Sequence, residues 1–129
     1  ARSVKEGRII RIDHDYADIS LREWTTLSRI SRKVGYTPED VLDIFRGRQV
    51  WVEHFHGMVS RYAHLDSVRP ELRVGDWVQA GEILGGAGSS GTNETVAHLH
   101  LELWYGGKYL GEGEAGSQLI ATLRRAFGQ

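Results

Sequence analysis

The chain has 129 residues, a formal net charge of −1 and no cysteine. This length suits one domain with a single core, and the near-neutral charge gives no reason to expect nucleic acid as a partner or insertion into a membrane. The absence of cysteine excludes disulfides, thiol nucleophiles and thiolate zinc sites. No apolar run reaches the roughly 18 residues of a membrane span. The 16 glycines and only 2 prolines favour a β-rich fold with many tight turns.

The first elements in chain order are a strand and a helix. Residues 7–16 contain β-branched isoleucines in an extended pattern and predict a strand. The apolar spacing then becomes helical. Ser20 and Glu23 form a capping box at the start of this helix, and Gly35 is expected to end it.

A second helix follows immediately. Thr37 is its expected N-cap and Pro38 its first helical residue, and Gly47 is expected to end it. The two helices together occupy residues 20–46. A segment of about 27 residues cannot bury a core of its own, so the pair is predicted to be an insertion between strands.

The rest of the chain returns to short apolar runs between glycine-containing turns. Alternating residues in 49–55 and 58–65 predict a hairpin. Short strands are expected over 74–84, and a further strand over 97–105. The apolar stripe of residues 117–127 predicts a C-terminal helix. The predicted fold class is therefore mainly β, with a two-helix insertion and a C-terminal helix.

Two histidines lie two residues apart in the strand predicted over 97–105. Residues i and i+2 of a strand point to the same face, so His98 and His100 are expected to project together. Two imidazoles on one face can share a metal ion or a proton relay. The alternative is a solvated strand face that happens to carry two polar side chains.

Four motifs in order resemble the lysostaphin-type (LytM-like, β-lytic) zinc metallopeptidases. They are Tyr-Ala-His-Leu at 62–65, Val-Gly-Asp-Trp-Val with Gly-Glu-Ile-Leu-Gly at 74–85, Gly-Ser-Ser-Gly at 88–91, and His-Leu-His-Leu-Glu at 98–102. The resemblance covers roughly residues 1–12 and 47–113. It implies a glycine-rich antiparallel β-sheet of the barrel-sandwich, duplicated-hybrid-motif type, as a single peptidase-like domain over 1–129. It also implies cleavage of peptidoglycan peptide cross-links in the cell envelope, either periplasmic or extracellular.

The resemblance assigns roles to three histidines. His100 matches the histidine that binds zinc, whereas His98 and His64 match the pair that activates or orients the attacking water and steadies the transition state. These roles agree with the chemistry of imidazole. A neutral ring binds zinc well, and zinc lowers the pKa of a bound water toward about 7. A second imidazole with a pKa of about 6.5 can take and return a proton.

The remaining zinc ligands of the family are where this sequence departs from the pattern. The family's early HxxxD motif precedes a Gly-x-Val step, and the match to that step begins at Gly7. We therefore expect the motif to fall before Ala1, so that this chain lacks the N-terminal zinc-ligand segment. The chain has one HxxxD of its own, from His14 to Asp18. These two residues are either substitute ligands or part of a charged loop that leads into the first helix.

Several other side chains could belong to the site. Glu102 shares the predicted face of the histidine pair, and either orients an imidazole or is a plain surface carboxylate. His54 and His56 repeat the i, i+2 spacing and are expected at a solvated hairpin end. Three tryptophans are expected to pack in the core or on the hairpins, the alternative being a platform that binds sugar: Trp51, Trp77 and Trp104.

The sequence leaves three functions open. The first is a zinc metalloendopeptidase-type domain acting on peptidoglycan peptides, with zinc weakly bound or absent because the metal site is incomplete. The second is a non-catalytic envelope scaffold or activator of cell-wall hydrolases. The third is a lipoyl- or biotinyl-like carrier, suggested by residues 74–82 but opposed by the lack of any lysine between Lys33 and Lys108. We favour the first.

Overall fold

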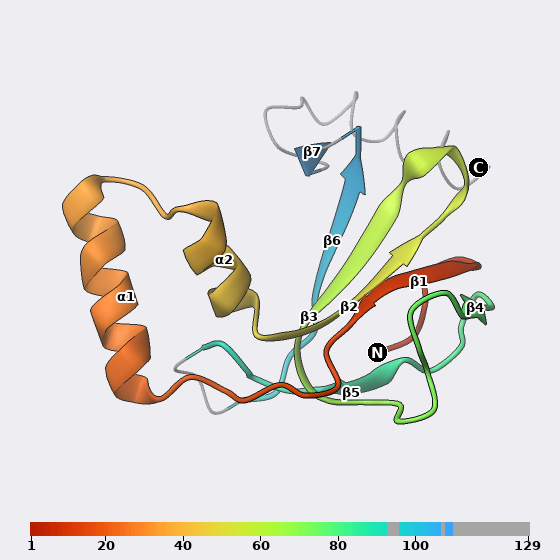
Figure 1. Cartoon of the computed structure of the whole chain (residues 1–129), viewed down its shortest axis with the longest axis horizontal. Coiled ribbons are helices and arrows are strands. Elements are labelled where there is room, and N and C mark those ends of the chain that lie inside the picture. Colours follow the sequence, from red (N-terminus) through yellow and green to blue (C-terminus); the bar gives the residue numbers. More distant parts are fainter. Residues whose placement is uncertain (93–95, 107, 110–129) are drawn as a thin grey trace.

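The computed structural model describes residues 1–92, 96–106 and 108–109 (Figure 1). The strands of this part form one curled antiparallel sheet in the order β4-β1-β2-β3-β6-β7, and β5 pairs with β3. Their bounds are β1 Gly7–Ile12, β2 Arg48–Glu53, β3 Val59–Val68, β4 Trp77–Val78, β5 Gly85–Ala87, β6 His100–Tyr105 and β7 Lys108–Tyr109. The predicted mainly β fold class is confirmed. The predicted C-terminal helix over residues 117–127 lies outside the described residues.

The pairing register gives the central strands two different faces. One face is the apolar core, which consists of Ile9, Val50, Val52, Tyr62, Leu65, Leu72, Val78 and Leu84. Each fully buried aliphatic or aromatic side chain contributes about 1.5–3 kcal/mol, so this face holds the domain together. The opposite face, here called the polar face, carries cross-strand neighbours from β1, β2, β3 and β6: Arg11, Trp51, Arg61, His100, Glu102 and Trp104.

The first inserted helix, α1 (Leu21–Val34), begins and ends as predicted. The side chain of Ser20 accepts a hydrogen bond from the backbone of Glu23, and the side chain of Glu23 accepts one from the backbone of Ser20. Gly35 closes the helix with φ 85, a left-handed conformation in which a glycine avoids a Cβ clash. Within the described residues, no helix combines the length and the hydropathy needed to span a membrane.

The second helix, α2 (Glu39–Arg46), differs from the prediction at its start. Pro38 is the N-cap, with φ −58 and ψ 151. That backbone is extended and not helical, so Pro38 precedes the helix and Thr37 does not cap it. Gly47 ends the helix as predicted, and its N–H donates to the carbonyl of Ile44.

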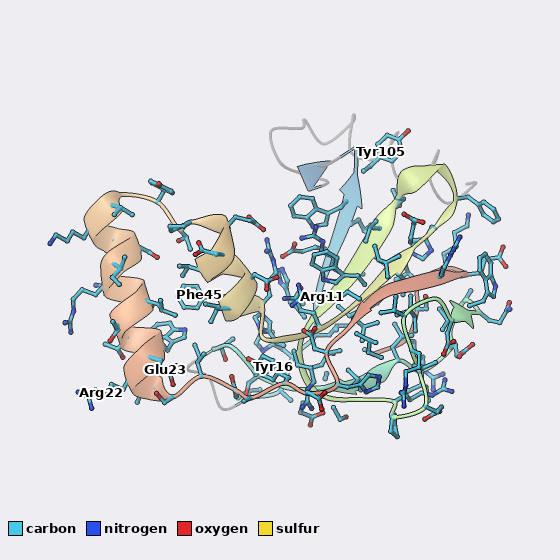
Figure 2. The ribbon with its side chains drawn as sticks, in the orientation of Figure 1. Arg11, Tyr16, Arg22, Glu23, Phe45 and Tyr105 are labelled. Carbon is cyan, nitrogen blue, oxygen red and sulfur yellow. The ribbon has the colours of Figure 1, made fainter. Side chains whose placement is uncertain are left out.

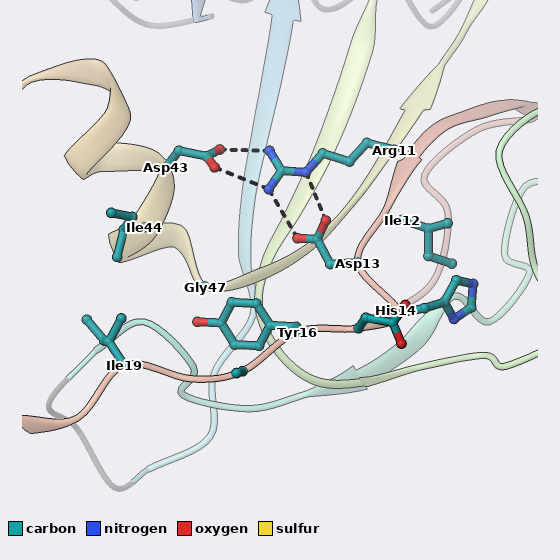
Figure 3. Close-up of a pocket in the computed structure, with 11 residues that line it drawn as sticks. Arg11, Ile12, Asp13, His14, Tyr16, Ile19, Asp43, Ile44 and Gly47 are labelled. Atoms are coloured by element: carbon teal, nitrogen blue, oxygen red, sulfur yellow. Dashed lines mark hydrogen bonds and ion pairs between the residues drawn. The ribbon is translucent and has the colours of Figure 1, made fainter.

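The two helices stand beside the sheet, and α2 lies between α1 and β6 (Figure 1). The rings of Trp24 and Phe45 join α1 to α2, with centroids 6.0 Å apart. Arg11 of β1 joins α2 to the sheet, because its guanidinium donates to Asp43 at 2.7 Å and to Asp13 at 3.0 Å (Figure 3). Burial disfavours this charge, but both carboxylates outweigh burial and raise the pKa of Arg11. The network lines an open pocket of about 600 Å³.

Candidate active site

A β-bulge in β3 turns His64 away from the core. Between Tyr62 and Leu65, β3 carries one residue more than the facing part of β2. Regular alternation would place His64 on the same face as Tyr62, which is fully buried. His64 instead has φ 58, the only positive φ among the described residues that are not glycine. Such a backbone costs on the order of 1–3 kcal/mol, and the extra residue re-aims the imidazole.

The re-aimed ring lies beside the two histidines of the predicted pair. The ring centroid of His64 is 5.0 Å from that of His98 and 5.5 Å from that of His100. His100 begins β6 opposite Ala63, whereas His98 precedes the strand and donates its backbone N–H to the carbonyl of Gly88 at 2.9 Å. The structure therefore gathers the three imidazoles that the sequence singled out. We call them the histidine cluster.

Glu102 fixes the ring of His100. Nε2 of His100 lies 2.8 Å from Oε2 of Glu102, and Glu102 is only 6% exposed. Burial alone would raise the pKa of Glu102, but hydrogen bonds from His100, Trp104 and Arg46 outweigh it and lower the pKa to about 2. The ionised carboxylate accepts the Nε2 proton, so the neutral ring presents the lone pair of Nδ1. This arrangement is typical of metal-binding histidines and excludes a plain surface role for Glu102.

The helical insertion supplies another partner of Glu102. Arg46, the last residue of α2, donates from Nε to Oε2 of Glu102 at 3.0 Å and from Nη1 to Glu39 at 3.0 Å. Its side chain is 11% exposed. A basic residue in the last turn of a helix is ordinarily explained by the helix dipole. The sequence therefore held no signal that Arg46 reaches a strand 56 residues further along the chain.

The loop of residues 88–91 holds the ring of His64 in place. Nδ1 of His64 lies 2.9 Å from the carbonyl of Ser90. A carbonyl only accepts, so Nδ1 carries the proton and Nε2 is the proton acceptor. Ser90 is held by its hydroxyl, which donates to the Leu65 carbonyl at 2.7 Å and accepts from the Arg48 N–H at 3.0 Å. Gly47 permits this packing, because a Cβ there would collide with Ser90.

His14 and Asp18 bond to backbone groups of two different loops. Nε2 of His14 lies 2.5 Å from the carbonyl of Leu72, and Asp18 accepts from the backbone N–H of Gly91 at 2.8 Å. Each residue therefore ties its own part of the segment after β1 to a different loop. The structure does not bring this pair together with the histidine cluster as one metal site.

The solvated hairpin end predicted for His54 is wrong. His54 is 6% exposed, its Nδ1 donates to the carbonyl of Glu6 at 2.8 Å, and its Nε2 lies 2.8 Å from Oγ of Ser60. Burial lowers the pKa of His54. The prediction failed because Ser60 turns inward and gives the ring a buried polar partner. Trp77 is 49% exposed and packs edge-on against Phe55, with ring centroids 6.2 Å apart.

Comparison with solved structures shows which proteins have a similar fold. The catalytic domain of the prophage-encoded M23 protein EnpA from Enterococcus faecalis has a similar fold, with a TM-score of 0.57 and 21% identity over 90% of this chain and 68% of that one. LytU gives 0.53 and 22% over 94% and 63%. The catalytic domain of lysostaphin from Staphylococcus simulans gives 0.50 and 22% over 80% and 56%. The chain therefore shares its fold with these three proteins.

A family model then identifies the family. The model of Peptidase family M23 matches residues 33–111, and the chain belongs to this family, as the sequence motifs predicted. It spans between 56% and 68% of the three solved chains named above. Peptidases of family M23 are generally zinc-dependent.

The described residues fit a part of a zinc site. His100 has an ionised carboxylate partner at Nε2, which leaves Nδ1 as the nitrogen that could bind zinc. Within residues 1–92, 96–106 and 108–109, however, no group of three or more His, Cys, Asp or Glu side chains could hold a metal ion. Catalytic zinc ordinarily has three protein ligands, so these residues supply fewer ligands than a complete site needs.

Proposed function

We propose that residues 1–129 form a zinc metalloendopeptidase-type domain that acts on the peptide cross-links of peptidoglycan in the cell envelope. The observation that carries this proposal is the histidine cluster, with His100 held by Glu102 on the polar face. Membership of family M23 supports peptide hydrolysis as the reaction. The similarity in fold to lysostaphin, an antimicrobial peptidase, supports a bacterial cell-wall substrate.

In this proposal the residues of the cluster divide the chemistry. His100 would bind zinc through Nδ1, and zinc, when bound, would lower the pKa of a coordinated water toward about 7. His64 accepts a proton at Nε2, because its Nδ1 proton is already given to the carbonyl of Ser90. The same carbonyl stabilises the imidazolium that this transfer creates. His98, whose ring is 5.0 Å from that of His64, would be a further polar side chain beside the carbonyl of the cleaved bond.

The small number of zinc ligands determines how much peptide hydrolysis we expect. The described residues contribute one zinc ligand, His100, so we expect this chain to bind zinc weakly and to hydrolyse peptide slowly. A site that loses zinc readily should need excess zinc in the assay.

The test is hydrolysis of purified peptidoglycan, followed by the release of free amino groups, with zinc in excess or with a chelator. We expect slow hydrolysis that zinc restores and the chelator abolishes. His64→Ala and His100→Ala should lose it, while His14→Ala, the matched control, should keep it. Failure of the wild-type chain to hydrolyse with excess zinc would overturn the proposal, and so would activity that survives His100→Ala.

A further inference from the structure

Arg61 lies on the polar face between two indole rings. Its Cζ is 3.7 Å from the ring centroid of Trp51 and 3.9 Å from that of Trp104. Hydrogen bonds hold both rings in place, because Nε1 of Trp51 donates to Gln49 at 2.8 Å and Nε1 of Trp104 donates to Glu102 at 2.9 Å. The guanidinium is therefore fixed by cation–π contacts on both sides. The two tryptophans, expected to be packing residues, instead clamp a charge.

Among the described residues, no carboxylate forms an ion pair with the guanidinium of Arg61. Its neighbours Arg11 and Arg46 each form ion pairs with two carboxylates. Within the described part of the chain the side chain of Arg61 forms no ion pair and donates no hydrogen bond, and its Nε is buried without an acceptor. Its cross-strand partner Glu102 already accepts three hydrogen bonds from other residues.

The unpaired donors of the Arg61 side chain suit an anionic ligand. A buried charged donor without an acceptor is costly, and each such group in a folded protein calls for an explanation. Burial, together with the nearby charge of Arg46, lowers the pKa of Arg61, although the carboxylates of Glu102, Glu39 and Asp43 oppose this shift. Arg61 itself is only partly buried, so a ligand can reach it.

The position of Arg61 relates this anion to the histidine cluster. Arg61 pairs with Glu102, and Ala63, two residues further along β3, pairs with His100. Two residues of a strand span roughly 7 Å. A peptide bound in extended form covers the same distance in about two residues. An anion at Arg61 would therefore belong to a residue about two positions from a bond held at the cluster.

We propose that Arg61, clamped between Trp51 and Trp104, binds a carboxylate of the substrate peptide about two residues from the cleaved bond. A planar guanidinium can hold a carboxylate with two parallel hydrogen bonds. Arg61 is then a specificity-determining residue that selects peptides by charge and sets their position in the site. The identification of the ligand as a substrate peptide rests on the proposed function. The binding of a carboxylate by Arg61 does not depend on that function.

The test is binding without turnover. The full chain, kept in a chelator, is titrated with N-acetylated tri-alanine as the free acid and as the C-terminal amide, and binding is followed by tryptophan fluorescence. A charged hydrogen-bonded pair favours the acid by about tenfold in Kd. Arg61→Gln should abolish this preference. Arg22→Gln, on the exposed side of α1 (Figure 2), should keep it.

Three outcomes would overturn the proposal: equal binding of acid and amide by the wild-type chain, a preference that survives Arg61→Gln, or displacement of the acid peptide by an equal concentration of inorganic phosphate. If Arg61→Gln does not fold, Arg61→Lys replaces it. That variant keeps the charge but loses the planar fork, so the preference should fall several-fold, and an unchanged preference counts against the site. Zinc is absent throughout, so a failure of peptidoglycan hydrolysis would refute the proposed function without touching this result.

Discussion

The two faces of the same strands have different roles: one stabilises the fold, and the other carries the polar side chains of the candidate site. On the core face, side chains such as Val50 and Leu65 are fully buried and apolar, and their contribution to folding does not depend on any ligand. On the polar face, alternate residues of the same strands hold ionised and aromatic groups whose partners are other polar groups. The bulge at His64 shows that a shift of one residue in strand register is enough to move a side chain from one face to the other. One extra residue moves an imidazole from the core side to the side that carries the chemistry.

The largest expected effect concerns stability on the core face. Leu65→Ala should lower the free energy of unfolding by about 3 kcal/mol, because Leu65 is fully buried and its truncation leaves a cavity. Leu101→Ala is the matched control, since Leu101 is 36% exposed and should cost less than about 1 kcal/mol. Urea denaturation measures both. Equal losses of unfolding free energy in the two variants would mean that the apolar core extends over Leu101 of β6, contrary to the division into a core face and a polar face.

On the polar face, Glu102→Gln should weaken zinc binding by about 10- to 100-fold, because the carboxylate orients His100 and raises its basicity. Glu53→Gln is the control, since Glu53 is exposed on β2 and touches no histidine of the cluster. Competition with a coloured zinc chelator measures both affinities. The same affinity in the two variants would remove Glu102 from the metal site.

The stability of the wild-type chain should also depend on the charge of Glu102. Its pKa is about 2 in the folded chain, against 4.5 for the ordinary group. A lowered carboxyl pKa stabilises the fold above the unfolded value, and this contribution disappears as the pH falls from about 4.5 to about 2. The difference in unfolding free energy between wild type and Glu102→Gln should therefore shrink by roughly 2 kcal/mol over that range. A difference that stays constant with pH would show that Glu102 is not ionised through these contacts.

The smallest effect should come from the insertion. Arg46→Gln leaves Glu102 with two of its three donors, so zinc affinity should fall by several-fold and less than in Glu102→Gln. Arg32→Gln, in the last turn of α1 and exposed, should leave it unchanged. Equal affinities in Arg46→Gln and Arg32→Gln would make the insertion a packed decoration with no part in the site.

These contrasts also show what a sequence can predict. The ends of α1, and the projection of His98 and His100 toward the same ring, depend on residues close together in the chain, so local rules predicted them. The contact between Arg46 and Glu102 joins residues 56 positions apart, and no local pattern contains it. His64 was identified by its motif, but the bulge that turns it toward the cluster is a property of strand register. His54 was misjudged because its buried partner, Ser60, lies on the next strand.

The central claim is that the chemistry of this chain lies at the histidine cluster and not at its other histidines. The most direct test is nitrogen-15 NMR of the imidazole rings while zinc is added to the wild-type chain. We expect His100 to carry its proton on Nε2 before zinc, and its Nδ1 signal to move most on addition, with His64 and His98 following. His14 and His54 should stay unchanged. A first response at His14 or His54, or a His100 ring protonated on Nδ1, would contradict the claim.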